Sequence, residues 1–159
     1  MLTFARRVRF GALALTLLGA ITLSAGPAQA VTPSGHSSPG VQSGWDGYRV
    51  KAADDPAVYL VLCGTRRWIP GPATYDNIFA DWNGIATTNV NNIPRGGDLS
   101  DGAALGKGPN TDATFLISNG LKMWISSPAT FDKYHFDWSK IRIVDQGWLD
   151  GVPSGCSLY

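Results

Sequence analysis

The chain has 159 residues, with 13 Lys and Arg against 12 acidic residues, so its formal net charge is +1. All 12 acidic residues are Asp, a residue type that favours turns and helix caps, and there is no Glu. A nucleic-acid-binding protein normally shows a strong basic excess, so this balance argues against nucleic acid as a partner.

The first 30 residues have the layout of a secretory signal peptide. Three arginines precede an apolar stretch (residues 10–25), and residues 28–30, Ala-Gln-Ala, form a small-x-small cleavage site. The strongly apolar part has only about 15 residues, whereas a membrane-spanning helix needs roughly 20. We therefore expect cleavage after Ala30 and a secreted or cell-wall-associated protein that does not insert into the membrane.

Beyond the signal peptide we expect a short linker and one folded domain. Residues 31–44 are rich in Ser, Gly and Pro and lack hydrophobic periodicity, as in a flexible linker. Residues 45–159 are long enough to form a single domain with a hydrophobic core. Three of the 13 basic residues precede residue 31, so residues 31–159 hold 13 − 3 = 10 basic and 12 acidic residues, a balance of −2.

Cys63 and Cys156 are the only two cysteines. Export favours a disulfide between them. Such a bond closes most of the domain into a loop and contributes up to about 4–5 kcal/mol in the chain-entropy model. The alternative, a nucleophilic Cys, needs a positioned His, and the only candidates are His36 and His135.

The most informative feature is an internal repeat. Residues 57–85 align without gaps to residues 113–141 at an offset of 56, and 12 of the 29 positions are identical. The segment that leads into this match also recurs, with residues 46–50 resembling residues 101–105. The two copies therefore run from 46 to 100 and from 101 to 156. One copy alone cannot bury its apolar face, so we expect the two to pack pseudo-symmetrically about a twofold axis.

Each copy contains the pattern of a β-hairpin. In the second copy, apolar residues 115–117 and 122–125 flank Asn119-Gly120, a dipeptide typical of hairpin turns. In the first copy, residues 58–62 and 66–69 flank a turn at Gly64.

A short helix and a further strand follow each hairpin, which together predict an α+β, β-rich fold. Ser127 is a capping residue type and Pro128 suits the first helical position, so a helix is expected to begin there. Phe131, Tyr134 and His135 then share one helix face, and we expect partly buried packing for His135. Residues 141–144 alternate as a strand, and their counterpart, residues 87–90, is weaker.

The repeat supports one resemblance. The pattern Tyr-Leu-Val-x-x-Gly-x-Arg/Lys-x-Trp-Ile-x-x-Pro-Ala-Thr-Tyr/Phe-Asp resembles short tandem repeats of exported bacterial proteins, often found near cell-wall-linked modules. It covers nearly all of residues 46–156. The resemblance implies an extracellular repeat module.

Aromatic and basic residues supply the candidate binding site. Planar rings stack on sugars, but aromatics that recur in both copies, such as Trp82 and Trp138, are expected to build the repeated core. The unpaired aromatics, including Tyr159, are the better binding candidates, and basic residues beside the hairpin tryptophans can lie over an indole or grip an anion. The predicted ligand-binding residues are Trp45, Tyr48, Arg66, Arg67, Trp68, Trp124 and Trp148.

No catalytic constellation is apparent in the sequence. Glycoside hydrolysis needs two acids that flank a bond, but the recurring Asp76/Asp132 and Asp81/Asp137 are explained by helix caps and turns, and no Glu is present as a proton donor. Asp98 and Asp101 lack the spacing of a calcium loop. No phosphate loop or clustered His/Cys ligands occur, so no cofactor or metal is expected.

The sequence thus predicts a secreted, non-catalytic binding module whose partner is an extracellular glycan or cell-wall polymer. Two copies offer two equivalent weak sites, and bivalency raises avidity on a polymer. The alternative is a small secreted inhibitor of an extracellular protease or other enzyme, acting through a hairpin loop such as residues 63–67.

Overall fold

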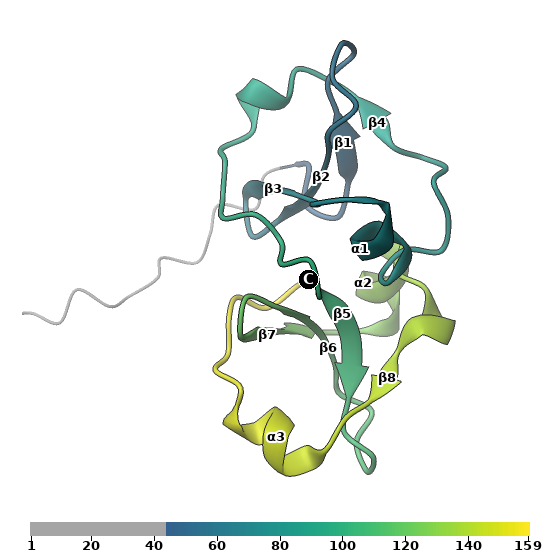
Figure 1. Cartoon of the computed structure of the whole chain (residues 1–159), viewed down its shortest axis with the longest axis vertical. Coiled ribbons are helices and arrows are strands. Elements are labelled where there is room, and N and C mark those ends of the chain that lie inside the picture. The colour runs from purple at the N-terminus through teal and green to yellow at the C-terminus, as the bar shows by residue number, and fades with distance from the viewer. Residues whose placement is uncertain (1–43) are drawn as a thin grey trace, which may run out of the picture. The chain divides into compact units, whose positions relative to one another are not determined.

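The computed structural model describes residues 44–159 (Figure 1). The predicted signal peptide and all but the last residue of the predicted linker lie outside the described residues. Two four-stranded mixed sheets with a few short helices confirm the α+β, β-rich fold. None of the helices within residues 44–159 is long and apolar enough to cross a membrane.

The first sheet has the strand order β3-β2-β1-β4. Its strands are β1 (Arg49–Lys51), β2 (Val58–Leu62), β3 (Thr65–Trp68) and β4 (Ala86–Thr87). Only the β1–β4 pair is parallel. The two-residue turn between β2 and β3 is Cys63-Gly64, and both residues have positive φ (53° and 75°), as a type I′ hairpin turn requires.

The second sheet repeats this arrangement in the order β7-β6-β5-β8. Its strands are β5 (Ala104–Lys107), β6 (Thr114–Ser118), β7 (Leu121–Ile125) and β8 (Arg142–Ile143). The predicted Asn119-Gly120 turn is confirmed, with φ of 52° and 69°. Strands β1 and β5 were not assigned from the sequence, because each is short and lacks clear alternation.

Short helices link the strands. They are α1 (Pro72–Asp76), the 3-10 helix η1 (Val90–Asn92), α2 (Pro128–Lys133), the 3-10 helix η2 (Trp138–Lys140) and α3 (Gln146–Gly151). Ser127 caps α2 as predicted, because its side chain accepts a hydrogen bond from the Thr130 N–H. The structure adds α3, capped by Asp145, which the sequence analysis did not assign.

The strand register corrects the alignment of the lead-in segments. Arg49 lies opposite Leu60, and Leu105 lies opposite Leu116, the repeat counterpart of Leu60. The offset is therefore 56 here as well, and not the 55 implied by matching residues 46–50 to 101–105. A buried arginine in the first copy thus corresponds to a buried leucine in the second.

The main hydrophobic core draws on both sheets and on α1 and α2. Leu60 and Tyr75 of the first copy pack in the same cluster as Leu116 and Phe131 of the second. A smaller cluster lies around Val50 in the first copy. The predicted disulfide is present between Cys63 and Cys156, with 6.5 Å between the two Cα atoms.

The end of α2 differs from the prediction that His135 shares a helix face with Phe131 and Tyr134. The helix ends at Lys133, and His135 adopts a left-handed conformation with φ of 57°. The Phe136 N–H donates to the Phe131 carbonyl and the His135 N–H donates to the Asp132 carbonyl, which is a Schellman motif. Phe136 is buried instead, and the His135 side chain is 40% exposed, consistent with the partly buried packing expected for it.

Candidate ligand-binding grooves

An exposed tryptophan lies flat against a buried aromatic ring in each copy. The Trp82 ring stacks on Tyr75 with 3.8 Å between ring centroids, and the Trp138 ring stacks on Phe131 at 3.9 Å. The inner rings are 1% exposed, whereas Trp82 is 47% and Trp138 is 50% exposed. Each outer indole therefore has one face covered by the fold and the other free.

A hydrogen bond holds each stacked indole at its edge. Trp82 Nε1 donates to Asp76 Oδ1 at 3.0 Å, and Trp138 Nε1 donates to Asp132 Oδ1 at 2.8 Å. The recurrence of Asp76 and Asp132 is thus explained by indole positioning and not by helix capping. Asp81 and Asp137 do cap turns as expected, because each side chain accepts a backbone N–H two residues later.

A second tryptophan lines a groove beside each stacked indole. The first groove is lined by Trp68, Tyr75 and Trp82 together with residues at the start of β2 and of α1. The second groove is lined by Trp124, Phe131 and Trp138 together with the corresponding segments of β6 and α2. Their volumes, about 430 and 810 Å³, lie within the range of small-ligand sites.

These positions overturn the expectation that Trp82 and Trp138 help to build the repeated core. Tyr75 and Phe131 are core residues, as expected. The four repeated tryptophans are not, because each is between 36% and 50% exposed. Among them, Trp68 and Trp124 were predicted as binding residues, while Trp82 and Trp138 were missed. The available signal was the recurring Asp-to-Trp spacing of six residues.

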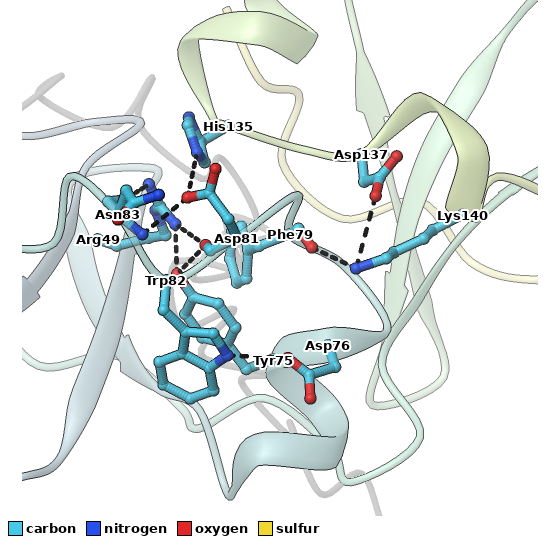
Figure 2. A network of polar contacts seen from close by, with 10 residues as sticks. All are labelled: Arg49, Tyr75, Asp76, Phe79, Asp81, Trp82, Asn83, His135, Asp137 and Lys140. Atoms are coloured by element: carbon cyan, nitrogen blue, oxygen red, sulfur yellow. Dashed lines mark hydrogen bonds and ion pairs between the residues drawn. The ribbon is translucent and has the colours of Figure 1, made fainter.

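Arg49 organises the loop that carries Trp82 (Figure 2). Its buried guanidinium donates to the Asp81 and Asn83 carbonyls and to the Tyr75 hydroxyl. The Tyr75 hydroxyl in turn donates to the Asp81 carbonyl at 2.9 Å. Burial raises the pKa of Tyr75, so the ring remains neutral under the stacked indole. A charged side chain from β1 therefore sets the position of the first groove's outer wall.

The loop that carries Trp138 is held by different contacts. The Lys140 ammonium donates to the Phe79 carbonyl and lies 3.5 Å from Asp137 Oδ2 (Figure 2). Hydrogen bonds from the Ser139 hydroxyl and its backbone N–H lower the pKa of Asp137. Because Phe79 belongs to the first copy, the second groove is positioned partly across the contact between the copies.

His135 also reaches across the copies, to Asp81. Its Nε2 lies 3.2 Å from Asp81 Oδ1, while the Ala80 N–H donates to the His135 carbonyl. The Asn83 N–H, and after it the His135 side chain, lower the pKa of Asp81. Both side chains are exposed to solvent, so the pair contributes little to stability at physiological salt.

The predicted basic residues are largely engaged by the fold. Arg66 donates to the Val90 and Ile93 carbonyls, and its guanidinium lies over the Tyr59 ring rather than over an indole. Arg67 donates to the Gly97 carbonyl, and burial lowers its pKa. Neither arginine lines one of the two grooves.

The remaining predicted aromatics lie apart from the grooves. Trp45 meets Tyr48 edge to face at 5.4 Å and packs on the smaller core cluster. Trp148 is exposed on α3, and Tyr159 is the exposed C-terminal residue. The structure therefore brings Trp45 to Tyr48, but it places neither of them, nor Trp148, beside Trp68 or Trp124.

Within residues 44–159 no group of three or more His, Cys, Asp or Glu side chains is arranged to hold a metal ion. Comparisons of the chain with known protein families, with curated proteins and with solved structures give no significant match. The candidate site therefore stands on its own geometry.

Proposed function

We propose that the protein is a secreted, non-catalytic module that binds an extracellular glycan through its tryptophan-lined grooves. One observation carries this proposal: each copy holds an exposed indole by stacking it on a buried ring and tying its N–H to an Asp. Exposed apolar rings held in this way lose little conformational freedom on binding, and they suit the apolar face of a sugar ring.

The second tryptophan of each groove supplies a polar edge beside the stacking face. Within the described residues, no hydrogen bond is found from the indole N–H of Trp68 or Trp124, and each ring is more than a third exposed. An indole N–H donates and does not accept, so it pairs with a sugar hydroxyl. A stacking face and a free donor in one groove favour a hydroxyl-bearing ring over a purely apolar ligand.

The arrangement of the two copies is part of the same proposal. The sheets share strand order and register, and the grooves use equivalent positions of the repeat. We propose that the copies are pseudo-symmetric units of one module. Export through the N-terminal signal, a disulfide suited to an oxidising compartment, and the resemblance to repeats near cell-wall modules all favour cell-wall polysaccharide as the target.

Retention on insoluble polymers tests this function. The purified oxidised protein is incubated with cell-wall preparations, cellulose and chitin, and the bound fraction is measured over a range of protein concentrations. We expect saturable retention that soluble fragments of the same polymer displace. A Trp82→Ala/Trp138→Ala double variant should lose it, whereas Ile143→Ala, which removes an exposed apolar side chain outside both grooves, should retain it.

Two results would overturn the proposal. The first is the absence of saturable retention on every polymer. The second is retention that survives the double variant and falls instead with Trp148→Ala, because the binding surface would then lie on α3 and not in the grooves.

A further inference from the structure

The two grooves share their aromatic walls but differ in most of the polar side chains that line them. At four equivalent positions the second groove carries a polar side chain and the first carries an apolar one or none: Asp112 against Pro56, Thr114 against Val58, Ser126 against Pro70 and Ser127 against Gly71. The lining of the second groove is therefore the more polar of the two.

The first groove has fewer polar groups, and the fold already engages part of them. The Asp55 carboxylate accepts the Ala57 N–H at 2.8 Å, and the Tyr75 hydroxyl is bonded to Arg49 and to the Asp81 carbonyl. A sugar hydroxyl placed in this groove would find few side-chain partners, chiefly the indole N–H of Trp68 and the remaining acceptor sites of Asp55. Burying a hydroxyl without a hydrogen bond is unfavourable.

The second groove keeps free polar groups, although the Thr114 hydroxyl donates to the Asp112 carbonyl and the Ser127 hydroxyl accepts the Thr130 N–H. Lys107 lines it, and within the described chain its ammonium makes no hydrogen bond; the nearest carboxylate oxygen, on Asp112, is 3.9 Å away. The Asp112 side chain is fully exposed. The hydroxyl of Ser126 has one partner, Thr130 Oγ1, and retains further hydrogen-bonding capacity.

The charges of Lys107 and Asp112 cancel. A hydroxyl is both a donor and an acceptor, so vicinal hydroxyls can accept from the ammonium and donate to the carboxylate. An anionic ligand would meet Asp112, and it would also meet a domain with a net charge of −2. The local charge pattern therefore matches an uncharged sugar.

Resting on the function proposed above, we infer that the second groove is the glycan-binding site, and that it takes a neutral pyranose unit. The sugar ring packs on the indoles of Trp124 and Trp138, and its vicinal hydroxyls accept from the Lys107 ammonium and donate to the Asp112 carboxylate. The first groove, with the same aromatic walls but fewer free polar side chains, contributes less to glycan affinity.

Matched variants of the two grooves test this inference on cellulose, on chitin and on a polyanionic gel of polygalacturonate. Trp138→Ala should weaken retention on the neutral polymers roughly tenfold or more, at least five times the loss caused by Trp82→Ala. Lys107→Met, which keeps most of the aliphatic stem, should weaken it several-fold. Lys51→Met, its counterpart in the first copy and outside the first groove, is the control and should leave retention unchanged.

The thermal midpoint of each variant is measured alongside, so that a loss of binding is separated from a loss of folding. Equal losses for Trp82→Ala and Trp138→Ala would overturn the inference while leaving the proposed function in place. Stronger retention on polygalacturonate than on the neutral polymers would also overturn it. Absence of retention by the wild-type protein on every polymer would overturn the proposed function and this inference together.

Discussion

The Trp138 indole N–H donates to Asp132, six residues earlier, at 2.8 Å. Asp132 belongs to α2, and Trp138 opens η2, so the bond ties the exposed ring to the helix whose Phe131 supports it from below. With its inner face stacked and its N–H engaged, the indole has little freedom left. This rigidity is what a binding platform requires, because ordering a mobile side chain would cost free energy on binding.

Asp132→Ala is expected to weaken glycan retention roughly twofold to tenfold, since an indole released from its Asp must be ordered again when ligand binds. Asp132→Asn is the matched control, because its amide oxygen still accepts the indole N–H. Retention isotherms on the neutral polymers measure both variants. Equal losses for the two, or no loss for Asp132→Ala, would show that the hydrogen bond does not contribute to binding.

Arg49 and Tyr75 form a buried polar pair in the first copy, and the second copy has Leu105 and Phe131 at the corresponding positions. Arg49→Leu alone should lower the free energy of unfolding by about 1–3 kcal/mol, because the Tyr75 hydroxyl and the Asp81 carbonyl lose a charged donor. With Tyr75→Phe present as well, the first copy carries the same apolar pair as the second, Leu and Phe.

A double-mutant cycle measures this coupling. Denaturant unfolding of the two single variants and of the double variant should give a combined loss that is smaller than the sum of the single losses by about 0.5–3 kcal/mol. Strict additivity would contradict a shared role for the two residues in holding the Trp82 loop.

Much of the fold could be predicted from the sequence because local residue preferences determine its turns and helix starts. Asn119-Gly120 and Cys63-Gly64 supply the positive φ of their hairpin turns, and Ser127-Pro128 begins α2. The strands β1 and β5 were not assigned because partners far along the chain create them: β1, for example, pairs with β2 and with β4.

Only half of the candidate site could be predicted from the sequence, and the reason is physical. A tryptophan that recurs in both copies can be a core residue or an exposed binding residue, and the sequence alone does not distinguish these roles. Burial distinguishes the two cases, and burial depends on tertiary packing. The structure shows that Phe131 fills the core position and Trp138 covers it from outside. The one local signal is an Asp six residues before each such tryptophan, and in sequence alone a helix cap or a turn explains that Asp equally well.

Tyr134 should make the protein sensitive to alkali. Burial, followed by the charge of Asp46, raises the pKa of Tyr134 well above its ordinary value near 10. Above about pH 10 the unfolded chain therefore releases this proton while the folded chain keeps it, so stability falls as pH rises. Between pH 8 and pH 11, Tyr134→Phe should lose less stability than the wild type in denaturant unfolding. Tyr48→Phe, at an exposed ring, is the control, and parallel pH profiles for Tyr134→Phe and wild type would contradict the prediction.

His135 occupies the left-handed position of the Schellman motif, where glycine is the usual residue. Both His135→Gly and His135→Ala lose the contact with Asp81, but only His135→Gly removes the steric cost of this conformation. The glycine variant should therefore be more stable than the alanine variant by about 1 kcal/mol. Thermal unfolding compares the two, and an alanine variant as stable as the glycine variant would show that the backbone at this position is not strained.

The Cys63–Cys156 disulfide joins the first hairpin turn to the C-terminal segment across 93 residues of chain. In the chain-entropy model, a loop of this length contributes about 4–5 kcal/mol by restricting the unfolded state. A Cys63→Ser/Cys156→Ser double variant should lose most of this free energy of unfolding, and the loss should match that of the wild type in the presence of a reductant. Reductant should leave the double variant unchanged, which controls for other effects of the reagent. If the free energy of unfolding of the double variant lies within about 1 kcal/mol of that of the oxidised wild type, the prediction is wrong. The core shared by the two copies, and not the disulfide, would then account for the stability of the folded state.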